Sequence, residues 1–365
     1  MKKLFALLIP LALLLCLCAC AGGDGGLQNL NLVSEYTRDL EGTKLNVYNW
    51  GEYISETRQM HVVKAFRALT GIKVSYTNFD TNEDLYVKLA AGGAGYDVIF
   101  PSDYMIQRLI AEDRLEEIDF ANIPNYKYIL DDYKSLYFDP QDKYSVPYTM
   151  GMVGLLYNST LVKEPPDSWA ALWDPRYAGQ ILQFSSSRDA FGTAQYLLGQ
   201  DINSLNPADW DAAANKLKQQ APLVQDYVSD EIYDILGPGN AILAPYYAGD
   251  FLMMQAENPD LAFAYPKEGT NFFYDSICIP KGARNIPAAE LFINFMLEPD
   301  VALANAETIM YASPHRAVQE NPAYSLKGNE FLYPSAMPIT QIFKHLPKGT
   351  QTLMNKLWME VQHTK

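Results

Sequence analysis

The first half of the chain alternates between strand-like and helix-like patterns of hydrophobic residues. Strand patterns occur at residues 44–49, 72–76 and 97–100. Helical periodicity follows each of them, at residues 55–69, 84–91 and 104–111. This βαβαβα order predicts a parallel sheet covered by helices on both faces, and such sheets bind ligands beyond the carboxyl ends of their strands.

A second alternating unit is predicted further along the chain, after the Gly-containing apolar run at residues 150–158, which suits a strand crossing between two lobes. Its strand patterns lie at residues 181–184, 241–246 and 261–265, and its helical patterns at 189–198, at 209–219 and from about Gly249. The run after Asp275 and two helices at 288–297 and 299–309 then return the chain to the first lobe. We therefore expect an α/β protein with a mostly parallel sheet in each lobe, one lobe comprising residues 44–150 plus 275–317 and the other 151–274 plus 318–365.

Composition agrees with two large folded lobes. The 365 residues are 48% hydrophobic and 19% charged, which is enough apolar material for an extensive core. Acidic residues number 43 against 28 basic ones, giving a formal net charge of −15. That balance argues against nucleic acid as a partner and favours cationic ligands. Aromatic residues make up 13% of the chain, which hints at recognition through rings.

The first twenty residues have the form of an export signal. Two lysines precede an apolar run that contains Pro10 and is short for a membrane span. Residues 17–20, Leu-Cys-Ala-Cys, resemble a bacterial lipobox. We expect a signal peptide over residues 1–19, lipidation of Cys20, and a flexible tether over residues 20–43. An uncleaved anchor helix is the alternative, and both interpretations place the remaining chain outside the cytoplasmic membrane.

After cleavage a single cysteine, Cys278, would remain, so no intramolecular disulfide is expected. Its apolar surroundings indicate a buried small hydrophobe rather than a nucleophile. The four histidines are scattered, and Gly-x-Ser-x-Gly, Gly-x-Gly-x-x-Gly and P-loop patterns are absent from the sequence. We therefore expect no enzyme activity, no metal and no cofactor.

Acidic and aromatic residues recur together just after predicted strands. These clusters contain Trp50, Glu52 and Tyr53 after the first strand, Ser102, Asp103 and Tyr104 after the third, Asp189, Tyr246 and Asp250 in the second unit, and Phe273 and Asp275 near the return. Parallel α/β sheets gather such turns into one cleft. The sequence therefore predicts a common site with carboxylate edges and ring walls.

The chemistry of these side chains fits an aliphatic polyamine. Ammonium groups stripped of water need carboxylate or hydroxyl acceptors, whereas methylenes need apolar walls. A cation over an aromatic ring gains about 0.5 to 2 kcal/mol, and an unpaired buried ammonium costs several kcal/mol. Structural roles stay open for some of these residues. Trp50 also suits a core, Ser102 a helix N-cap, and Asp189 and Asp250 positions near helix starts that favour acids.

Several segments together resemble the spermidine/putrescine-binding proteins of polyamine ABC importers. The segments are residues 48–53, 96–104, 144–151, 168–173, 275–276 and 306–309. The resemblance spans roughly residues 44–335 and implies the two-lobed periplasmic-binding-protein fold of type II, closing over one ligand. It also implies a separate membrane permease and ATPase as partners.

By position, the resemblance assigns ligand contacts to both lobes. Trp50, Glu52, Tyr53, Ser102 and Tyr104 would line the first lobe, Asp275 the hinge, and Asp189, Tyr246, Phe273 and Tyr311 the rest of the site. Asp250 resembles an acid of putrescine receptors. The chain departs from the family at Ser186, an aspartate in spermidine receptors, at Tyr246 and Phe273, which replace tryptophans, and at Gly51, which replaces a hydroxyl residue.

The sequence thus indicates a monomeric, lipid-anchored receptor that captures putrescine, spermidine or both by lobe closure and delivers them to the permease. One alternative is a receptor of the same fold for another solute. For an amino acid, a cation would have to clamp the carboxylate, and the one basic residue near the expected cleft is Arg188, which we expect to orient a neighbour or to pair on the surface. A secreted glycosidase using two of the carboxylates is a further alternative.

Overall fold

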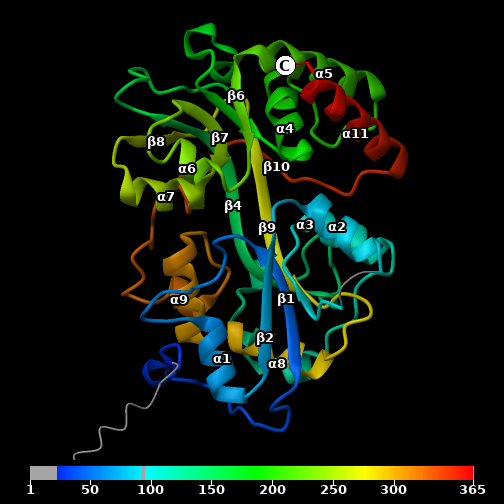
Figure 1. Ribbon diagram of the computed structural model, residues 1–365, viewed down its shortest axis with the longest axis vertical. Helices are drawn as coiled ribbons and strands as arrows, with labels where there is room; N and C mark the ends of the chain where they lie inside the picture. Colours follow the sequence, from blue (N-terminus) through cyan, green and yellow to red (C-terminus); the bar gives the residue numbers. More distant parts are fainter. Residues whose placement is uncertain (1–22, 93–94, 365) are drawn as a thin grey trace, which may run out of the picture.

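The computed structural model describes residues 23–92 and 95–364. The expected signal peptide of residues 1–19 and the expected lipidation site Cys20 lie outside the described residues. The described chain forms two α/β lobes, one above the other in Figure 1, joined by long strands that run through both. This is the two-lobed architecture that the sequence predicts. Within residues 23–92 and 95–364, no helix is long and apolar enough to cross a membrane.

Lobe 1, the lower lobe in Figure 1, has a sheet in the order β2-β1-β3-β9. Its first strands are β1 (Lys44–Trp50), β2 (Lys73–Phe79) and β3 (Val98–Ile99), and they are mutually parallel in this order. The helices that follow these strands are α1 (Val62–Thr70), α2 (Asn82–Ala90) and α3 (Asp103–Ala111). Helices α8 (Ile286–Met296) and α9 (Pro299–Ile309) return later in the chain and complete this lobe.

Lobe 2 continues the same sheet in the order β4-β7-β5-β6. Its own strands are β5 (Ile181–Phe184), β6 (Val224–Val228), β7 (Leu243–Tyr247) and β8 (Leu261–Ala264). Its helices are α4 (Ser187–Leu197), α5 (Pro207–Gln220), α6 (Ile232–Ile235), α7 (Ala248–Glu257) and α11 (Lys348–Gln362), which packs against α5. The remaining short elements are α10 (Arg316–Gln319) and β10 (Thr340–Gln341), which pairs with β9.

Two antiparallel strands, β4 (Ser145–Asn158) and β9 (Thr270–Cys278), connect the lobes. Their ladder runs from the pair Ser145 and Cys278 in lobe 1 to the pair Met152 and Phe272, and β4 then pairs with β7 and β8 in lobe 2. Every residue of β4 is buried, as expected for a strand covered on both faces. The predicted strands that cross between the lobes are confirmed.

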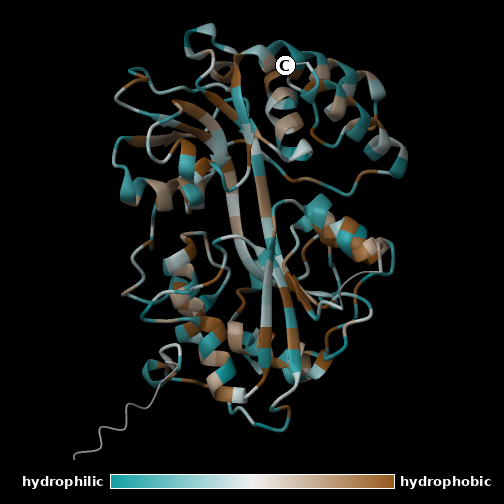
Figure 2. Ribbon diagram, viewed as in Figure 1, coloured by the Kyte–Doolittle hydropathy of each residue, from teal (hydrophilic) through white to brown (hydrophobic). Residues whose placement is uncertain are grey.

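Each lobe has its own hydrophobic core. Trp169, Trp210 and Phe191 are fully buried in lobe 2, and Phe66 and Phe292 occupy the core of lobe 1. Figure 2 shows brown, hydrophobic residues recurring along the central strands and mixed brown and teal on the covering helices. This pattern is that of helices with one apolar face packed on a sheet.

The first helix begins later than the sequence predicts. Helical periodicity indicates residues 55–69, but α1 spans Val62–Thr70. The amide of Ser55 donates to Asn305 Oδ1 at 2.8 Å, and its hydroxyl donates to the carbonyl of Met60 at 2.8 Å. These bonds hold the chain before α1 in a turn against α9, and a local hydrogen-bonding side chain of this kind competes with helix formation.

The described part of the N-terminal segment, which begins at residue 23, packs on lobe 1. Leucines 27, 30, 32 and 40 contact the lobe 1 core. Glu298, which is fully buried, accepts hydrogen bonds from the amides of Val33 at 2.7 Å and Ser34 at 3.0 Å and from the hydroxyl of Tyr36 at 2.8 Å. These contacts differ from the flexible tether expected for residues 20–43, because the polar stretch also carries apolar side chains that lobe 1 buries.

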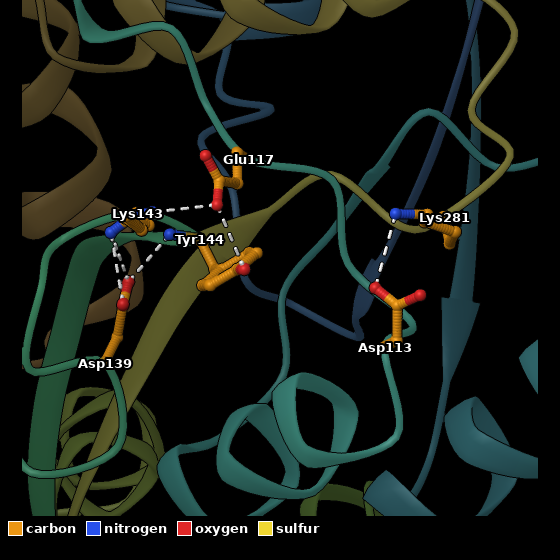
Figure 3. A network of polar contacts seen from close by, with 6 residues as sticks. All are labelled: Asp113, Glu117, Asp139, Lys143, Tyr144 and Lys281. Atoms are coloured by element: carbon orange, nitrogen blue, oxygen red, sulfur yellow. Dashed lines mark hydrogen bonds and ion pairs between the residues drawn. The ribbon is translucent and has the colours of Figure 1, made fainter.

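A polar network in lobe 1 fixes the turn that enters β4 (Figure 3). The buried carboxylate of Asp139 accepts hydrogen bonds from the amides of Lys143, Tyr144 and Ser145, at 3.1, 2.8 and 3.0 Å. Lys143 also pairs with Glu117 at 2.9 Å on the exposed surface. The buried carboxylate therefore holds the start of the crossing strand, while the exposed ion pair contributes little.

Candidate functional site

A cavity with about 810 Å³ of empty space, which includes space open to solvent, lies between the lobes and is lined by residues of both. All but one of the predicted ligand residues line it. They are Trp50, Tyr53, Ser102, Tyr104, Asp189, Tyr246, Asp250, Phe273, Asp275 and Tyr311. The structure therefore brings together, from six separate segments of the chain, the side chains that the sequence singles out.

Glu52 is the exception. Its backbone has a φ of 47°, in the left-handed region, and its side chain lines a neighbouring hollow together with Glu56 and Thr308. The turn after β1 thus directs Trp50 and Tyr53 to the cavity but not Glu52. The structure does not bring Glu52 to the site where the sequence places it.

Strand and helix ends position the polar residues of the cavity. Trp50 is the last residue of β1, Asp189 and Asp250 lie in the first turns of α4 and α7, and Asp275 lies on β9. Ser102 occupies the position before α3, yet it makes no capping hydrogen bond. Its hydroxyl instead accepts a hydrogen bond from Asn82 Nδ2 at 3.0 Å.

Asp275 is the most deeply buried of the predicted carboxylates, with 4% of the residue exposed. Its Oδ2 accepts a 2.6 Å hydrogen bond from the Tyr53 hydroxyl, and its Oδ1 has no hydrogen-bond partner in the described structure. Burial raises the pKa of Asp275 to about 6, although the hydroxyls of Ser102, Tyr53 and Thr149 oppose the shift. A residue that lines the cavity therefore has one carboxylate oxygen without a hydrogen bond among the described residues.

Asp250 is held between two tyrosines. The hydroxyls of Tyr233 and Tyr311 donate to its two carboxylate oxygens, each at 2.6 Å. Loss of solvent raises the pKa of Asp250 to about 6, and the nearby charges of Asp230 and Asp275 add to the shift. Tyrosine hydroxyls orient this carboxylate without neutralising it.

Asp189 accepts a hydrogen bond from the Tyr247 hydroxyl at 3.1 Å. Burial raises the pKa of this carboxyl, and the charge of Arg188 opposes the rise. Of the two roles expected for Arg188, pairing on the surface is wrong, because the residue is only 2% exposed. Its guanidinium lies 4.3 Å from the centre of the Phe343 ring and donates to Asn203 Oδ1 at 3.0 Å.

The carboxylates of the cavity lack cationic partners. Among the ion pairs of the described residues, none involves Asp189, Asp250 or Asp275. Over residues 23–92 and 95–364, no group of three His, Cys, Asp or Glu side chains is arranged to hold a metal ion. Buried carboxylates near one another without cations favour a ligand that brings positive charge.

Aromatic rings form a continuous wall beside these acids. Ring centres are separated by 5.1 Å between Tyr246 and Tyr247, by 5.5 Å between Tyr247 and Phe273, and by 6.1 Å between Phe273 and Tyr311. Successive edge-to-face contacts of this kind hold the rings in place. The wall offers apolar surface for methylenes and π faces for cations.

Several residues that line the cavity were not among the predicted ligand residues. They include Asp80, Asp103, Asp230, Tyr247, Asn271 and Phe343. Tyr247 lies in the aromatic run that drew attention to Tyr246. Asp80 directly follows β2, which extends to Phe79, beyond its predicted end at residue 76. Asp230 follows β6, which the hydrophobic pattern did not reveal.

Comparison with known proteins places the chain in a family. The sequence model described as bacterial extracellular solute-binding protein matches residues 61–329. The spermidine/putrescine-binding periplasmic protein of Escherichia coli K12 is 34% identical over 302 residues, covering 82% of this chain and 85% of that protein. The putrescine-binding periplasmic protein PotF of the same organism is 30% identical over 360 residues, covering 92% and 96%.

Solved structures agree with the sequence comparison. A structure from Listeria monocytogenes, described as a spermidine/putrescine ABC transporter, has a TM-score of 0.84 at 35% identity and covers 89% of this chain and all of that one. The substrate-binding protein PotD of Streptococcus pneumoniae has a TM-score of 0.72 at 32% identity and covers 88% and 99%. The chain belongs to the bacterial extracellular solute-binding proteins, in the group of the spermidine/putrescine-binding periplasmic proteins, which confirms the resemblance seen in the sequence.

Proposed function

We propose that this solute-binding protein captures an aliphatic polyamine in the cavity between its lobes and delivers it to the permease and ATPase of an ABC importer. One observation carries the proposal: the buried carboxylate of Asp275 and the half-buried carboxylates of Asp189 and Asp250, all without ion-pair partners among the described residues, line the same cavity as a wall of aromatic rings. Its relatives include a spermidine/putrescine-binding and a putrescine-binding periplasmic protein, which supports the same ligand class.

The contacts explain how such a ligand would be held. Asp275 keeps a free carboxylate oxygen for an ammonium group, and Asp189 and Asp250 present charge from lobe 2. Phe273 and Tyr311 lie between these acids and would cover the methylenes. An ammonium bound by a carboxylate in a site with little water gains far more than one at an exposed surface.

Lobe closure follows from the origin of the contacts. Trp50 and Tyr104 reach the cavity from lobe 1, and Asp189 and Asp250 reach it from lobe 2. A ligand that touches both sides binds the closed arrangement better than the open one, and this difference in affinity drives closure. We propose that β4 and β9 bend as the hinge, and that the protein acts as a monomeric binder rather than an enzyme.

Cellular placement is part of the proposal. The export signal expected over residues 1–19 and lipidation at Cys20 would hold the protein on the outer face of the cytoplasmic membrane. Metabolic labelling with an alkyne fatty acid tests this: wild type is expected to be labelled and Cys20→Ala is not.

Isothermal titration calorimetry tests ligand binding directly. We expect wild-type protein to bind putrescine, spermidine or both, and neither glutamate nor lysine. Asp275→Asn is expected to weaken polyamine binding by at least about 100-fold, since removing one member of a buried charge pair costs roughly 3 kcal/mol or more. Asp113 is exposed and does not line the cavity. Asp113→Asn therefore serves as the control and should leave polyamine affinity unchanged. Wild-type protein that binds no polyamine would contradict the proposal.

A further inference from the structure

The segment that leads from β10 to α11 also connects the two lobes. The amide of His345 donates to Gln107 Oε1 on α3 at 2.8 Å, and the Tyr137 hydroxyl donates to the carbonyl of Phe343 at 2.6 Å. Figure 1 shows this segment, drawn in red, passing just above α3. The lobes therefore meet along a seam beside the cavity already described.

The seam holds a pocket with about 350 Å³ of empty space, which includes space open to solvent. A second hollow shares Arg108, His345 and Gln351 with this pocket. The Lys, Arg and Glu residues that line the two are four basic and two acidic, namely Arg108, Arg188, Lys344, Lys348, Glu83 and Glu112. The chain as a whole has 28 basic residues against 43 acidic ones. The seam thus carries the opposite sign of charge from the rest of the protein.

The two acids do not neutralise this charge. Three of the basic residues form no ion pair among the described residues: Arg188, Lys344 and Lys348. Glu112 pairs with Arg108 at 3.0 Å. Glu83 accepts a hydrogen bond from the Tyr104 hydroxyl at 3.1 Å, and burial raises the pKa of Glu83 although the charge of Arg188 opposes the rise. Positive charge is therefore left over at the seam.

Arg188 brings a buried donor without an acceptor. The residue is 2% exposed and lines the pocket. Its terminal nitrogens donate to the carbonyl of Ile202 at 3.4 Å and to Asn203 Oδ1 at 3.0 Å, whereas its Nε forms no hydrogen bond among the described residues. A buried donor left unpaired costs about 1 to 3 kcal/mol, and more when the group is charged. An anion in the pocket would supply the missing acceptor.

His345 brings a second donor. The amide nitrogen of Gln351 donates to the carbonyl of Leu346 at 2.6 Å and lies 3.3 Å from His345 Nδ1, to which it donates its other proton. Since Nδ1 accepts, the neutral ring carries its own proton on Nε2, which takes part in none of the described hydrogen bonds. Burial lowers the pKa of His345, and the positive charges of Arg108 and Arg188 lower it further. The ring therefore lies in positive potential from both lobes.

We propose that this seam binds a small tetrahedral oxyanion of the sulfate or phosphate type, held by Arg188 and His345 from lobe 2 and by Arg108 from lobe 1. Arg108 uses its Nε for Glu112, which leaves its terminal nitrogens available. An Arg guanidinium suits such an anion because its planar N–H groups match the spacing of the oxygens.

The bound anion should also favour lobe closure. Closing the lobes brings Arg108 towards Arg188 and His345, and a negative charge between them offsets the repulsion of these like charges. An anion that binds the closed arrangement better than the open one must raise the affinity for the ligand that closes the lobes. This link rests on the proposed capture of a polyamine by closure, whereas the anion site itself does not.

Nuclear magnetic resonance of the histidine side chains tests the site in wild-type protein. Sodium sulfate is the probe, because the charge of sulfate stays constant while histidine titrates. We expect sulfate to raise the pKa of His345 by about one pH unit, as an opposite charge nearby does, and sodium chloride of the same ionic strength to raise it much less. The spectrum of His345→Gln identifies the signal. Equal shifts with the two salts would mean screening alone and would overturn the site.

Variants test the donors. Arg188→Lys keeps the charge but removes Nε, and we expect it to weaken sulfate binding about tenfold, the worth of one charge-assisted hydrogen bond. Since Arg188 is buried, Arg108→Gln provides a second variant at a side chain that is 19% exposed, with the same expected loss. Lys267 is exposed and lines neither hollow, so Lys267→Gln should bind sulfate as wild type does. Unchanged affinity in both arginine variants would contradict the assignment.

Calorimetry with spermidine tests the link to closure. Saturating sulfate should raise the spermidine affinity of wild type about fivefold relative to chloride of the same ionic strength, and should leave that of Arg188→Lys unchanged. Sulfate that binds without changing the spermidine affinity overturns the link. Wild type that binds no amine overturns the proposed function and the link with it, and the sulfate titration then decides the anion site by itself.

Discussion

The Tyr53 hydroxyl donates a 2.6 Å hydrogen bond to the carboxylate of Asp275 and so ties the turn after β1 to the crossing strand β9. The hydroxyl of Thr149, on the other crossing strand, lies 2.6 Å from the same tyrosine oxygen. All three groups are buried. This contact fixes one oxygen of Asp275, while the other oxygen forms no hydrogen bond among the described residues.

Replacing Tyr53 by phenylalanine removes the donor to Asp275. We expect the free energy of unfolding to fall by about 1.5 to 3 kcal/mol, as for a hydrogen bond to a charged group. The pKa of Asp275 should rise further, because the tyrosine hydrogen bond lowers it, so polyamine affinity should fall more at pH 6 than at pH 8. Urea unfolding and calorimetry at the two pH values measure both effects.

Tyr148→Phe is the control for that experiment. The Tyr148 hydroxyl donates to the backbone carbonyl of Tyr53 at 2.9 Å and not to a carboxylate. Its loss should reduce stability without changing the pH dependence of binding. If both variants shift that dependence alike, the assigned role of Tyr53 is wrong.

Ligand binding should depend on pH around 6. The pKa values of Asp250 and Asp275 are each raised to about 6. Below that pH the carboxylates take up protons and lose the charge that an ammonium needs. We therefore expect spermidine to raise the melting temperature much more at pH 7.5 than at pH 5. An equal increase at both pH values would show that these carboxylates do not bind the ligand.

In the absence of ligand, the stability of the protein contributed by Asp250 and Asp275 should fall as the pH rises. The folded pKa of about 6 lies above the unfolded value of about 4. These two groups therefore contribute stability that is complete below about pH 4 and is lost as the pH rises through about 6. Melting curves of wild type and of Asp250→Asn isolate the contribution, and the variant should lose part of the pH dependence.

A side chain at position 51 should hinder closure. In Gly51→Val the Cβ would overlap Asp230 Oδ2, so we expect about tenfold weaker ligand binding, with little change in the stability of the open protein. Small-angle X-ray scattering with saturating putrescine should show less compaction than in wild type. Adding Asp230→Ala to Gly51→Val should restore the compaction, and failure of the double variant to do so would exclude this overlap as the cause.

Glu298 should hold the N-terminal segment on lobe 1. Glu298→Ala leaves the amides of Val33 and Ser34 without their buried acceptor, and we expect a loss of about 2 to 4 kcal/mol of stability. Hydrogen exchange at these two amides should accelerate. Asp300→Asn, which alters an exposed contact to Asn31, should have a much smaller effect. Unchanged exchange at Val33 and Ser34 in Glu298→Ala would show that the segment is held elsewhere.

The sequence predicted site residues correctly where a clear hydrophobic pattern marked a strand and its end. Trp50, Ser102, Asp189 and Asp250 all follow strands whose apolar patterns were clear, so their convergence on one edge could be predicted from the rules of parallel sheets. Asp275 was found through its aromatic neighbours instead. The helices that the pattern indicated are present, with bounds that differ by a few residues except at α1.

Other features depend on tertiary contacts, which the hydrophobic pattern of the sequence does not predict. Strand β6 is half exposed at the edge of the sheet and carries Gln-Asp-Tyr in its middle, so it shows no apolar run, and Asp230 beyond it went unnoticed. The direction of Glu52 depends on one left-handed backbone angle. The packing of residues 27–40 depends on a glutamate that lies more than 250 positions away.

The register of β9 also limits which mutations the binding site of such a receptor can accept during evolution. Asn271, Phe273 and Asp275 line the cavity from alternate positions of one strand, and inserting or deleting a single residue there would turn every later side chain to the opposite face. Variation within this strand is therefore restricted to exchanges of one amino acid for another. Changes of length are confined to the loops beyond it, so new ligand preferences in related genes should arise by point substitution along this strand.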